Sequence, residues 1–191
     1  HGGDREAFLE YFKGCYSEGF DPDRHLVRVG VANQTTMMRG ETEEVQRRVM
    51  QAVRDRDGEE RSSQNFRFFD TICGATQERQ DALRQMLDEP MDLLLVVGGY
   101  NSSNTSHLAE MGEAKLPTYS IRNASRLESR ERVVHFDLHK KQEVTTDNWL
   151  PDRPLTIGIT AGASCPNNLI EDTILRLFEL HDIPKERLFE A

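Results

Sequence analysis

The chain has 191 residues, with 33 acidic against 24 basic side chains and a formal net charge of −9. This length suits one large domain or two small ones. The acidic balance argues against a nucleic-acid-binding protein, which needs a basic face, and no apolar run approaches the ~18 residues of a membrane-spanning helix. We therefore expect a folded globular protein that binds neither nucleic acid nor a membrane.

The chain contains three cysteines, Cys15, Cys73 and Cys165. An odd number of cysteines favours a reducing compartment over a disulfide framework. None of them forms a CxxC pair, and the chain shows no recognisable zinc-binding spacing. His135 and His139 lie four residues apart, which makes them only a weak candidate for a metal-binding pair.

In chain order, one local pattern recurs: a short apolar run, then small polar residues, then an amphipathic run. A helix is expected within Arg5–Gly19, before a turn at residues 20–23. The apolar runs predict strands at Leu26–Ala32, Phe66–Ile72, Met91–Val97, Pro117–Ile121 and Thr156–Thr160. Helical spacing follows at Glu41–Val53, from residue 77 to about Leu87, around Leu108 and Met111, and over Leu169–Leu177. Strands that alternate with helices predict an α/β fold with two similar lobes built on parallel sheets, and the charged segment Arg56–Ser63 reads as a loop between the lobes.

Four segments at the ends of these strands are rich in hydroxyls, amides and glycine and nearly free of charge. Right-handed crossovers place such segments at one edge of a parallel sheet. Helix N-termini and neutral donors can hold phosphate without lysine, so together the segments predict a diphosphate pocket. The alternative is that each segment only caps a helix. The segments are Asn33–Thr36, Cys73–Thr76, Gly98–Thr105 and Ala161–Ser164.

Cys73 lies at the same edge, directly after a strand. It is either a small buried core residue or a thiolate that faces the pocket, and its loop position favours the thiolate. Cys15 lies away from the strand ends and is expected to be inert. Cys165 follows Ser164 at the start of a helix, where helix packing is the commoner role.

Four longer motifs carry a resemblance to a known family. They resemble the 4-hydroxy-3-methylbut-2-enyl diphosphate reductase family, also called IspH or LytB, in both order and spacing. Asn148–Pro151 is similar to the plant and cyanobacterial branch. The resemblance runs from about Phe8 to Leu180, which is nearly the whole chain. The four motifs are Ala32–Met37, Thr71–Gln80, Val96–Thr105 and Gly158–Ser164.

The resemblance implies a reductase that removes a hydroxyl from an allylic diphosphate in the non-mevalonate isoprenoid pathway, giving isopentenyl and dimethylallyl diphosphates. It implies a 4Fe-4S cluster with Cys73 as one ligand, a ferredoxin- or flavodoxin-like electron donor, and a cytoplasmic location, or the plastid stroma in a photosynthetic eukaryote. Thr35 is implied as a catalytic residue beside the hydroxyl-bearing end of the substrate. The implied diphosphate-binding residues are Thr36, Ser102, Ser103, Asn104 and Ser164.

The resemblance also implies that part of the three-lobed enzyme is missing here. Residues 1–65 correspond to part of the middle lobe, and residues 66–191 to the third lobe with its C-terminal helix. The first lobe would hold the other two cysteine ligands. The pocket histidines and the proton-donating glutamate of the family would also lie upstream of His1. We therefore expect the chain alone to be inactive and to lack a stable cubane, because a single thiolate does not normally hold four irons.

Two other interpretations of the sequence remain. One is a non-catalytic diphosphate-binding or scaffold module without the redox lobe. The other is a generic phosphosugar-binding domain, and Cys73 argues against it because that role has no use for a thiol there.

Overall fold

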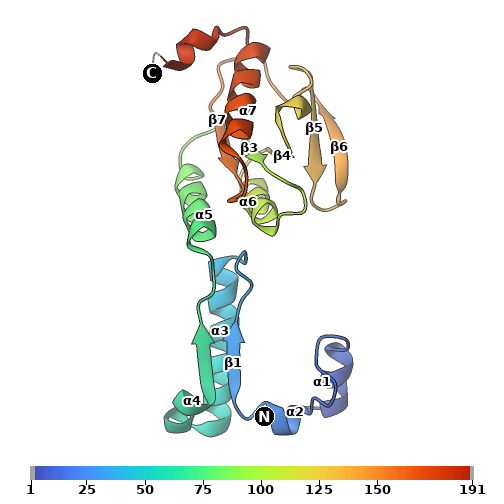
Figure 1. Cartoon of the computed structure of the whole chain (residues 1–191), viewed down its shortest axis with the longest axis vertical. Coiled ribbons are helices and arrows are strands. Elements are labelled where there is room, and N and C mark those ends of the chain that lie inside the picture. The colour runs from blue at the N-terminus through green and yellow to red at the C-terminus, as the bar shows by residue number, and fades with distance from the viewer. Residues whose placement is uncertain (1–2, 190–191) are drawn as a thin grey trace. The chain divides into compact units, whose positions relative to one another are not determined.

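A computed structural model describes residues 3–189 of the chain (Figure 1). The chain divides into two compact units. The first unit contains the residues up to Thr35 together with Arg39–Ile72. The second contains Thr36–Met38 and everything from Cys73 onward. The two units are described separately below.

The first unit is built on a two-stranded parallel sheet. Strand β1 pairs with β2 from Val29 opposite Phe66 to Ala32 opposite Phe69. Asp4 and Asp21 cap the first two helices with their side-chain oxygens, as short polar side chains do at helix starts. The elements are α1 (Arg5–Tyr11), α2 (Pro22–His25), β1 (Val29–Ala32), α3 (Arg39–Asp57), α4 (Glu59–Asn65) and β2 (Phe66–Phe69).

Helix α4 corrects one expectation from the sequence. The segment Arg56–Ser63 was expected to be a loop, but α3 extends to Asp57 and α4 begins at Glu59. The amphipathic pattern fails to reveal α4 because Ser62 is its only buried residue. Gly58 separates the two helices with a φ of 81°, a backbone conformation that glycine adopts without strain.

The second unit contains a five-stranded sheet in the order β6-β5-β4-β3-β7. Strands β3, β4 and β7 are parallel, whereas β5 and β6 are antiparallel to their neighbours. The elements are α5 (Gly74–Met86), β3 (Leu93–Val97), α6 (Ser103–Glu113), β4 (Thr118–Ile121), η1 (Ala124–Arg126), β5 (Arg132–Asp137), β6 (Gln142–Asp147), β7 (Ile157–Ala161), α7 (Asn167–Leu180) and η2 (Lys185–Phe189).

The α/β class is confirmed, and the expected parallel pairing is found between β1 and β2 and among β4, β3 and β7, but the second unit also contains antiparallel strands. The second unit has a mixed sheet because the hairpin β5–β6 extends it on one side. The first unit has two strands and the second has five. The hairpin was missed because polar and apolar residues mix along both strands, as with His135 on β5 and Thr145 on β6.

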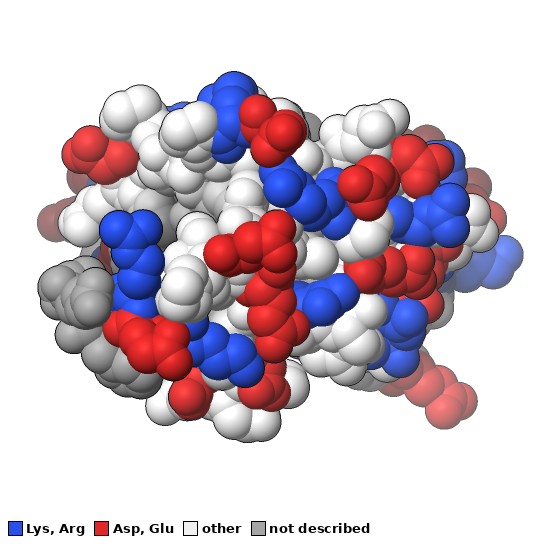
Figure 2. Space-filling model, turned by 90° about the horizontal axis from the view of Figure 1, so that it is seen from above, with Lys and Arg blue, Asp and Glu red and all other residues white. Residues whose placement is uncertain are grey.

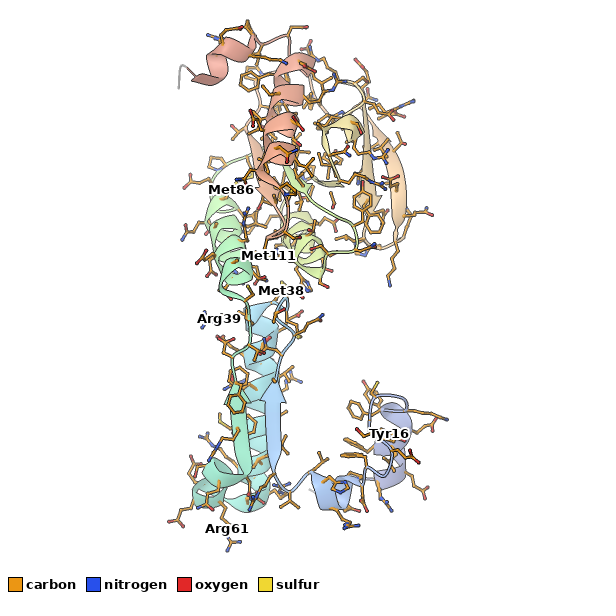
Figure 3. All side chains as sticks on the ribbon, viewed as in Figure 1. Tyr16, Met38, Arg39, Arg61, Met86 and Met111 are labelled. Carbon is orange, nitrogen blue, oxygen red and sulfur yellow. The ribbon has the colours of Figure 1, made fainter. Side chains whose placement is uncertain are left out.

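The core of the second unit lies on both faces of β3. All five residues of this strand are buried. Leu93, Leu95 and Val97 pack with residues of α7, whereas Leu94 and Val96 pack with residues of α5 and α6. Met86 of α5 and Met111 of α6 pack at the margin of the second cluster (Figure 3). This arrangement explains why Met91–Val97 reads as a continuous apolar run, since strands covered on both faces do not alternate.

The division between the units falls after Ile72, whereas the sequence suggested a boundary between residues 65 and 66. The difference is the strand β2, which begins at Phe66 and pairs with β1 of the first unit. Strand pairing across a long stretch of sequence decides this boundary, and local composition does not reveal it.

Acidic and basic side chains are intermingled on the face that Figure 2 shows. Within residues 3–189, no helix combines the length and the apolar character that crossing a membrane requires.

Candidate functional site

Two of the polar segments meet at the carboxyl ends of β3 and β7. The backbone N–H of Gly162, just after β7, donates a hydrogen bond to the carbonyl of Val97, the last residue of β3, at 3.0 Å. A Cβ atom built on Gly162 would lie 3.8 Å from Oγ of Ser102. The structure therefore brings Ser102 next to the turn that carries Ser164, as the parallel strands predict.

The N-terminus of α6 forms one side of this site. Ser102 is the N-cap, and Ser103 and Asn104 open the helix. Asn104 is only 3% exposed, yet neither its amide nitrogen nor its amide oxygen has a hydrogen-bond partner among the described residues. Leaving a buried polar group unsatisfied costs about 1–3 kcal/mol. A ligand that accepts from the amide nitrogen would relieve this cost, and the partial positive charge of the helix end favours an anion.

Ser164 lies in the turn between β7 and α7. Its side chain is exposed, and the turn is closed by the N–H of Cys165, which donates to the carbonyl of Gly162 at 2.8 Å. Cys165 itself packs against the core cluster around β3 and α7. Burial raises the pKa of the Cys165 thiol, and Arg79 opposes this shift. These contacts agree with the packing role expected for Cys165.

Cys73 is the N-cap of α5, and its side chain is exposed. Its carbonyl accepts the N–H of Gln77 at 3.0 Å, which fixes the backbone of Cys73 at the start of α5. Among the described residues, no three His, Cys, Asp or Glu side chains gather into a group that could hold a metal ion. A cubane needs several protein ligands. The described residues therefore do not fit a complete cluster, although Cys73 fits as a single exposed ligand.

The threonine segment divides between the two units. Thr35 is exposed and belongs to the first unit, whereas Thr36 belongs to the second. The hydroxyl of Thr36 is buried without a hydrogen-bond partner among the described residues. Gln80 of α5, fully buried, donates from its amide nitrogen to the carbonyl of Met37 at 3.4 Å. The helix that begins after Cys73 therefore also contacts the segment that carries Thr36.

Within the first unit, the segments after β1 and β2 are tied together. The backbone N–H of Asn33 donates to the hydroxyl oxygen of Thr71 at 3.2 Å, and that hydroxyl donates to the carbonyl of Asn33. The sequence predicted one shared edge for four segments. Within each unit, segments from adjacent strand ends do meet.

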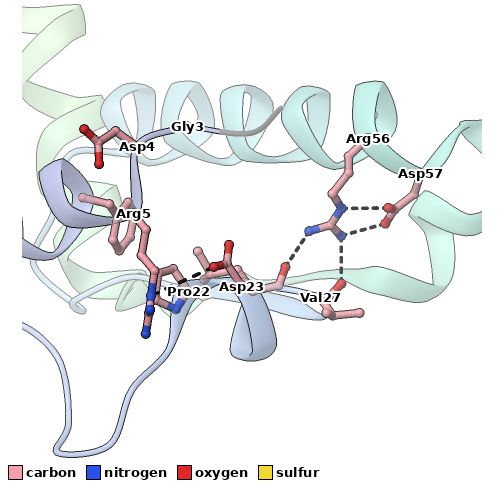
Figure 4. A pocket seen from close by; sticks show the side chains of 10 residues that line it. Gly3, Asp4, Arg5, Pro22, Asp23, Val27, Arg56 and Asp57 are labelled. Atoms are coloured by element: carbon pink, nitrogen blue, oxygen red, sulfur yellow. Dashed lines mark hydrogen bonds and ion pairs between the residues drawn. The ribbon is translucent and has the colours of Figure 1, made fainter.

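A cavity of about 530 Å³ also lies in the first unit, but both of its arginines are paired with aspartates of the same lining (Figure 4). Arg56 donates to the carbonyls of Leu26 and Val27 at 2.6 and 2.8 Å, and it pairs with Asp57 at 2.7 Å. The hydrogen bonds from Arg56 and Asn65 lower the pKa of Asp57 to about 2. The hydrogen bonds to Leu26 and Val27 fasten the end of α3 to the chain before β1, and Asp57 pairs with the same guanidinium, so Arg56 has a structural role.

The structure adds three residues that the sequence did not single out. Tyr100, in the turn after β3, stacks on Phe136 with ring centroids 4.7 Å apart, and the guanidinium of Arg122 lies 4.9 Å from the Tyr100 ring centroid. Gln80 donates to the carbonyl of Met37, next to Thr36. Thr105 lies against both Gly98 and Gly162, the glycines that begin the turns after β3 and β7. The only signal in the sequence is the glycine directly after each strand, at Gly98 and Gly162, because glycine marks close backbone approach.

The model of the family described as LytB protein matches residues 6–178. The chain belongs to the LytB family. This result confirms the family that the motifs indicated. Two curated relatives, both named 4-hydroxy-3-methylbut-2-enyl diphosphate reductase, are similar to this LytB chain. The relative from Gloeobacter violaceus is 52% identical over 184 residues, covering 96% of this chain and 44% of the relative. The relative from Thermosynechococcus vestitus is 50% identical, covering 96% and 46%.

The LytB chain thus spans less than half the length of these curated relatives. A solved structure, that of the E-1-hydroxy-2-methyl-but-2-enyl-4-diphosphate reductase from Plasmodium falciparum, matches with a TM-score of 0.52 and 20% identity. The match covers 79% of this chain and 39% of that one. At this identity the likeness shows the fold alone.

Proposed function

We propose that this chain is the carboxyl-terminal part of a 4-hydroxy-3-methylbut-2-enyl diphosphate reductase, and that its own task is to hold the diphosphate end of the substrate. The observation that carries the proposal is the buried amide of Asn104, which lacks a partner among the described residues and lies at the N-terminus of α6. The names of the relatives supply the substrate class.

The proposed diphosphate-binding site uses neutral hydrogen-bond donors rather than lysines. Ser102 and Ser103 contribute hydroxyls at the start of α6, and Ser164 contributes a hydroxyl from the adjacent turn. Thr36 contributes a buried hydroxyl from the segment held by α5. Each neutral hydrogen bond contributes on the order of 1 kcal/mol, and the helix dipole adds a similar amount. Affinity for a free diphosphate is therefore about millimolar, which corresponds to ~4 kcal/mol.

The reductive half of the reaction needs more than this chain provides. Replacing an allylic hydroxyl by hydrogen consumes an electron pair and protons and releases water. We assign Cys73 as one ligand of a 4Fe-4S cluster, which would supply electrons and a Lewis-acidic iron when its remaining ligands come from the rest of the polypeptide. Thr35 is assigned to the hydroxyl-bearing end of the substrate, where its O–H can donate a hydrogen bond. The electron donor is a ferredoxin- or flavodoxin-like protein of the cytoplasm or plastid stroma.

A second candidate function is a non-catalytic diphosphate-binding or scaffold module. The observation that favours it is the lack, among the described residues, of any cluster of metal-ligating side chains around Cys73. The reductase and a diphosphate-binding module both require the diphosphate site, whereas only the reductase requires the thiol. Cysteine substitution therefore discriminates between them: in the complete polypeptide, Cys73→Ser should abolish reductase activity and leave diphosphate binding intact.

The diphosphate site is tested by titrating the chain with pyrophosphate and following backbone amide resonances by NMR. The amides of residues 101–104 and 164 should shift first, with an apparent dissociation constant of about millimolar. The double variant Ser103→Ala, Asn104→Ala should lose these shifts, because it removes a hydroxyl and an amide from the same helix start.

A matched double variant, Ser63→Ala with Asn65→Ala, removes the same two residue types from α4 of the first unit and should leave the titration unchanged. Shifts that map instead to Arg122–Arg132 and survive the Ser103 and Asn104 substitutions contradict the proposal. That result would mean that arginines, and not the α6 helix start, bind the anion.

A further inference from the structure

Thr105, in the first turn of α6, fills a notch between two glycines. The residue is 2% exposed, and its hydroxyl oxygen has no hydrogen-bond partner among the described residues. A Cβ atom built on Gly98 would lie 2.6 Å from this oxygen, and one built on Gly162 would lie closer still. Real Cβ atoms essentially never approach another atom so closely, so the hydroxyl occupies the space that a side chain at either glycine would need.

The two glycines begin the two turns of the diphosphate site. Gly98 follows β3 and leads to Ser102, and Gly162 follows β7 and leads to Ser164. The backbone N–H of Thr105 also donates to Oγ of Ser102 at 3.3 Å. One residue therefore contacts both turns and one of the proposed phosphate donors.

We propose that Thr105 is a positioning residue whose hydroxyl sets the separation of the two turns, and thereby the separation of the Ser102 and Ser164 donors. The identity of the ligand in this inference rests on the proposed function, whereas the separation of the two turns is a property of the ligand-free chain. Because interiors are close-packed, the size of the group in the notch determines how near the turns can come. An oxygen fits between the two glycines, and a methyl group is larger.

The first test compares three substitutions in the 191-residue chain. Thr105→Ser keeps the oxygen and should retain pyrophosphate affinity within about twofold of the unchanged chain. Thr105→Val puts a methyl in the notch, and Thr105→Ala leaves it empty. Both should weaken binding by about tenfold, because small misplacements of binding groups are costly. Amide shifts in ligand-free spectra should report displacement of residues 102 and 164.

Thr173→Val is the matched control. Thr173 is a fully buried threonine on α7 whose hydroxyl donates to the carbonyl of Leu169 at 2.7 Å. Its substitution should lower the stability of the chain without changing pyrophosphate affinity. Equal losses of affinity in the Thr173 and Thr105 valine variants would overturn the inference, since both would then reflect stability alone.

The second test is a double-mutant cycle. Gly162→Ala places a methyl against the Thr105 hydroxyl, and adding Thr105→Ala removes the obstruction. The double variant should therefore displace the ligand-free amide resonances of Ser102 and Ser164 less than the two single changes summed. If the displacements in the double variant equal the sum of those in the two single variants, the positioning role of Thr105 is contradicted. If the unchanged chain does not respond to pyrophosphate, the proposed function fails, while this ligand-free cycle still decides the role of Thr105.

Discussion

The side-chain oxygen of Ser102 accepts a hydrogen bond from the backbone N–H of Thr105 at 3.3 Å and thereby caps α6. The same oxygen lies 3.8 Å from the position that a Cβ atom on Gly162 would take. Ser102 thus serves the helix and faces the proposed anion site at the same time. These two roles respond differently to substitution.

Replacing Ser102 separates capping from binding. Ser102→Ala should destabilise the chain by about 1 kcal/mol, because the cap is lost. Ser102→Asp should restore stability, since aspartate is an equally good N-cap, but it should abolish pyrophosphate binding by charge repulsion. Urea unfolding and the NMR titration measure the two effects. A stable aspartate variant that still binds pyrophosphate would place the anion elsewhere.

Gly112 is expected to tolerate no side chain. A Cβ atom there would lie 2.6 Å from the Thr118 hydroxyl and would collide with a methyl of Leu94, which is fully buried. Gly112→Ala should destabilise the chain by roughly 1–3 kcal/mol through overpacking, despite alanine's better helix propensity. Gly40→Ala is the control, because its Cβ would meet nothing within 4 Å. That variant should be neutral or up to about 1 kcal/mol more stable in urea unfolding.

The ion pair between Arg56 and Asp57 predicts acid sensitivity of the first unit. The hydrogen bonds from Arg56 and Asn65 lower the pKa of Asp57 from 3.8 to about 2. Because the folded state holds the carboxylate ionised, the unfolded state takes up the proton first as the pH falls. The contribution of Asp57 to stability is therefore complete above about pH 4 and is lost between pH 4 and pH 2.

Urea midpoints measured across this pH range should fall less steeply in Asp57→Asn than in the unchanged chain. Asp172→Asn, at an exposed position on α7, serves as the control and should leave the slope as it is. Identical slopes in all three proteins would mean that the ion pair does not contribute to folding.

Iron and sulfide reconstitution under anaerobic conditions should give no stoichiometric cubane on this chain alone. Only Cys73 is offered as a ligand, and a cubane needs several. Iron analysis and the visible spectrum measure the outcome. About four irons per chain, lost in Cys73→Ser and retained in Cys15→Ser, would contradict the expectation and show that chains share ligands or that other residues substitute for cysteine.

The sequence predicted both ends of the strands β3, β4 and β7 to within about two residues. The strands β3 and β7 lie in apolar runs of the sequence, and Pro117 directly precedes β4. The turns after β3 and β7 were placed correctly at adjacent strand ends, because parallel strands end at one edge. Elements that a local residue pattern specifies could therefore be predicted from the sequence.

Contacts between distant segments were not predictable in the same way. The fit of Thr105 between Gly98 and Gly162 depends on β7 lying beside β3, across some sixty intervening residues. Helix α4 lacks an apolar stripe, and the hairpin β5–β6 mixes polar with apolar residues. In each case tertiary pairing decides the structure, and intrinsic preference does not.

The assignment of Thr36–Met38 to the second unit affects how the protein could be divided genetically. The chain enters the second unit at Thr36, returns to the first at Arg39, and enters the second again at Cys73. A gene cut at codon 73 would express a second unit without this three-residue insertion. The amide nitrogen of Gln80, which donates to the Met37 carbonyl, would then be left without its acceptor inside the folded unit. Separate expression of the two units therefore calls for a split gene or a circularly permuted one, in which the short insertion is supplied together with α5.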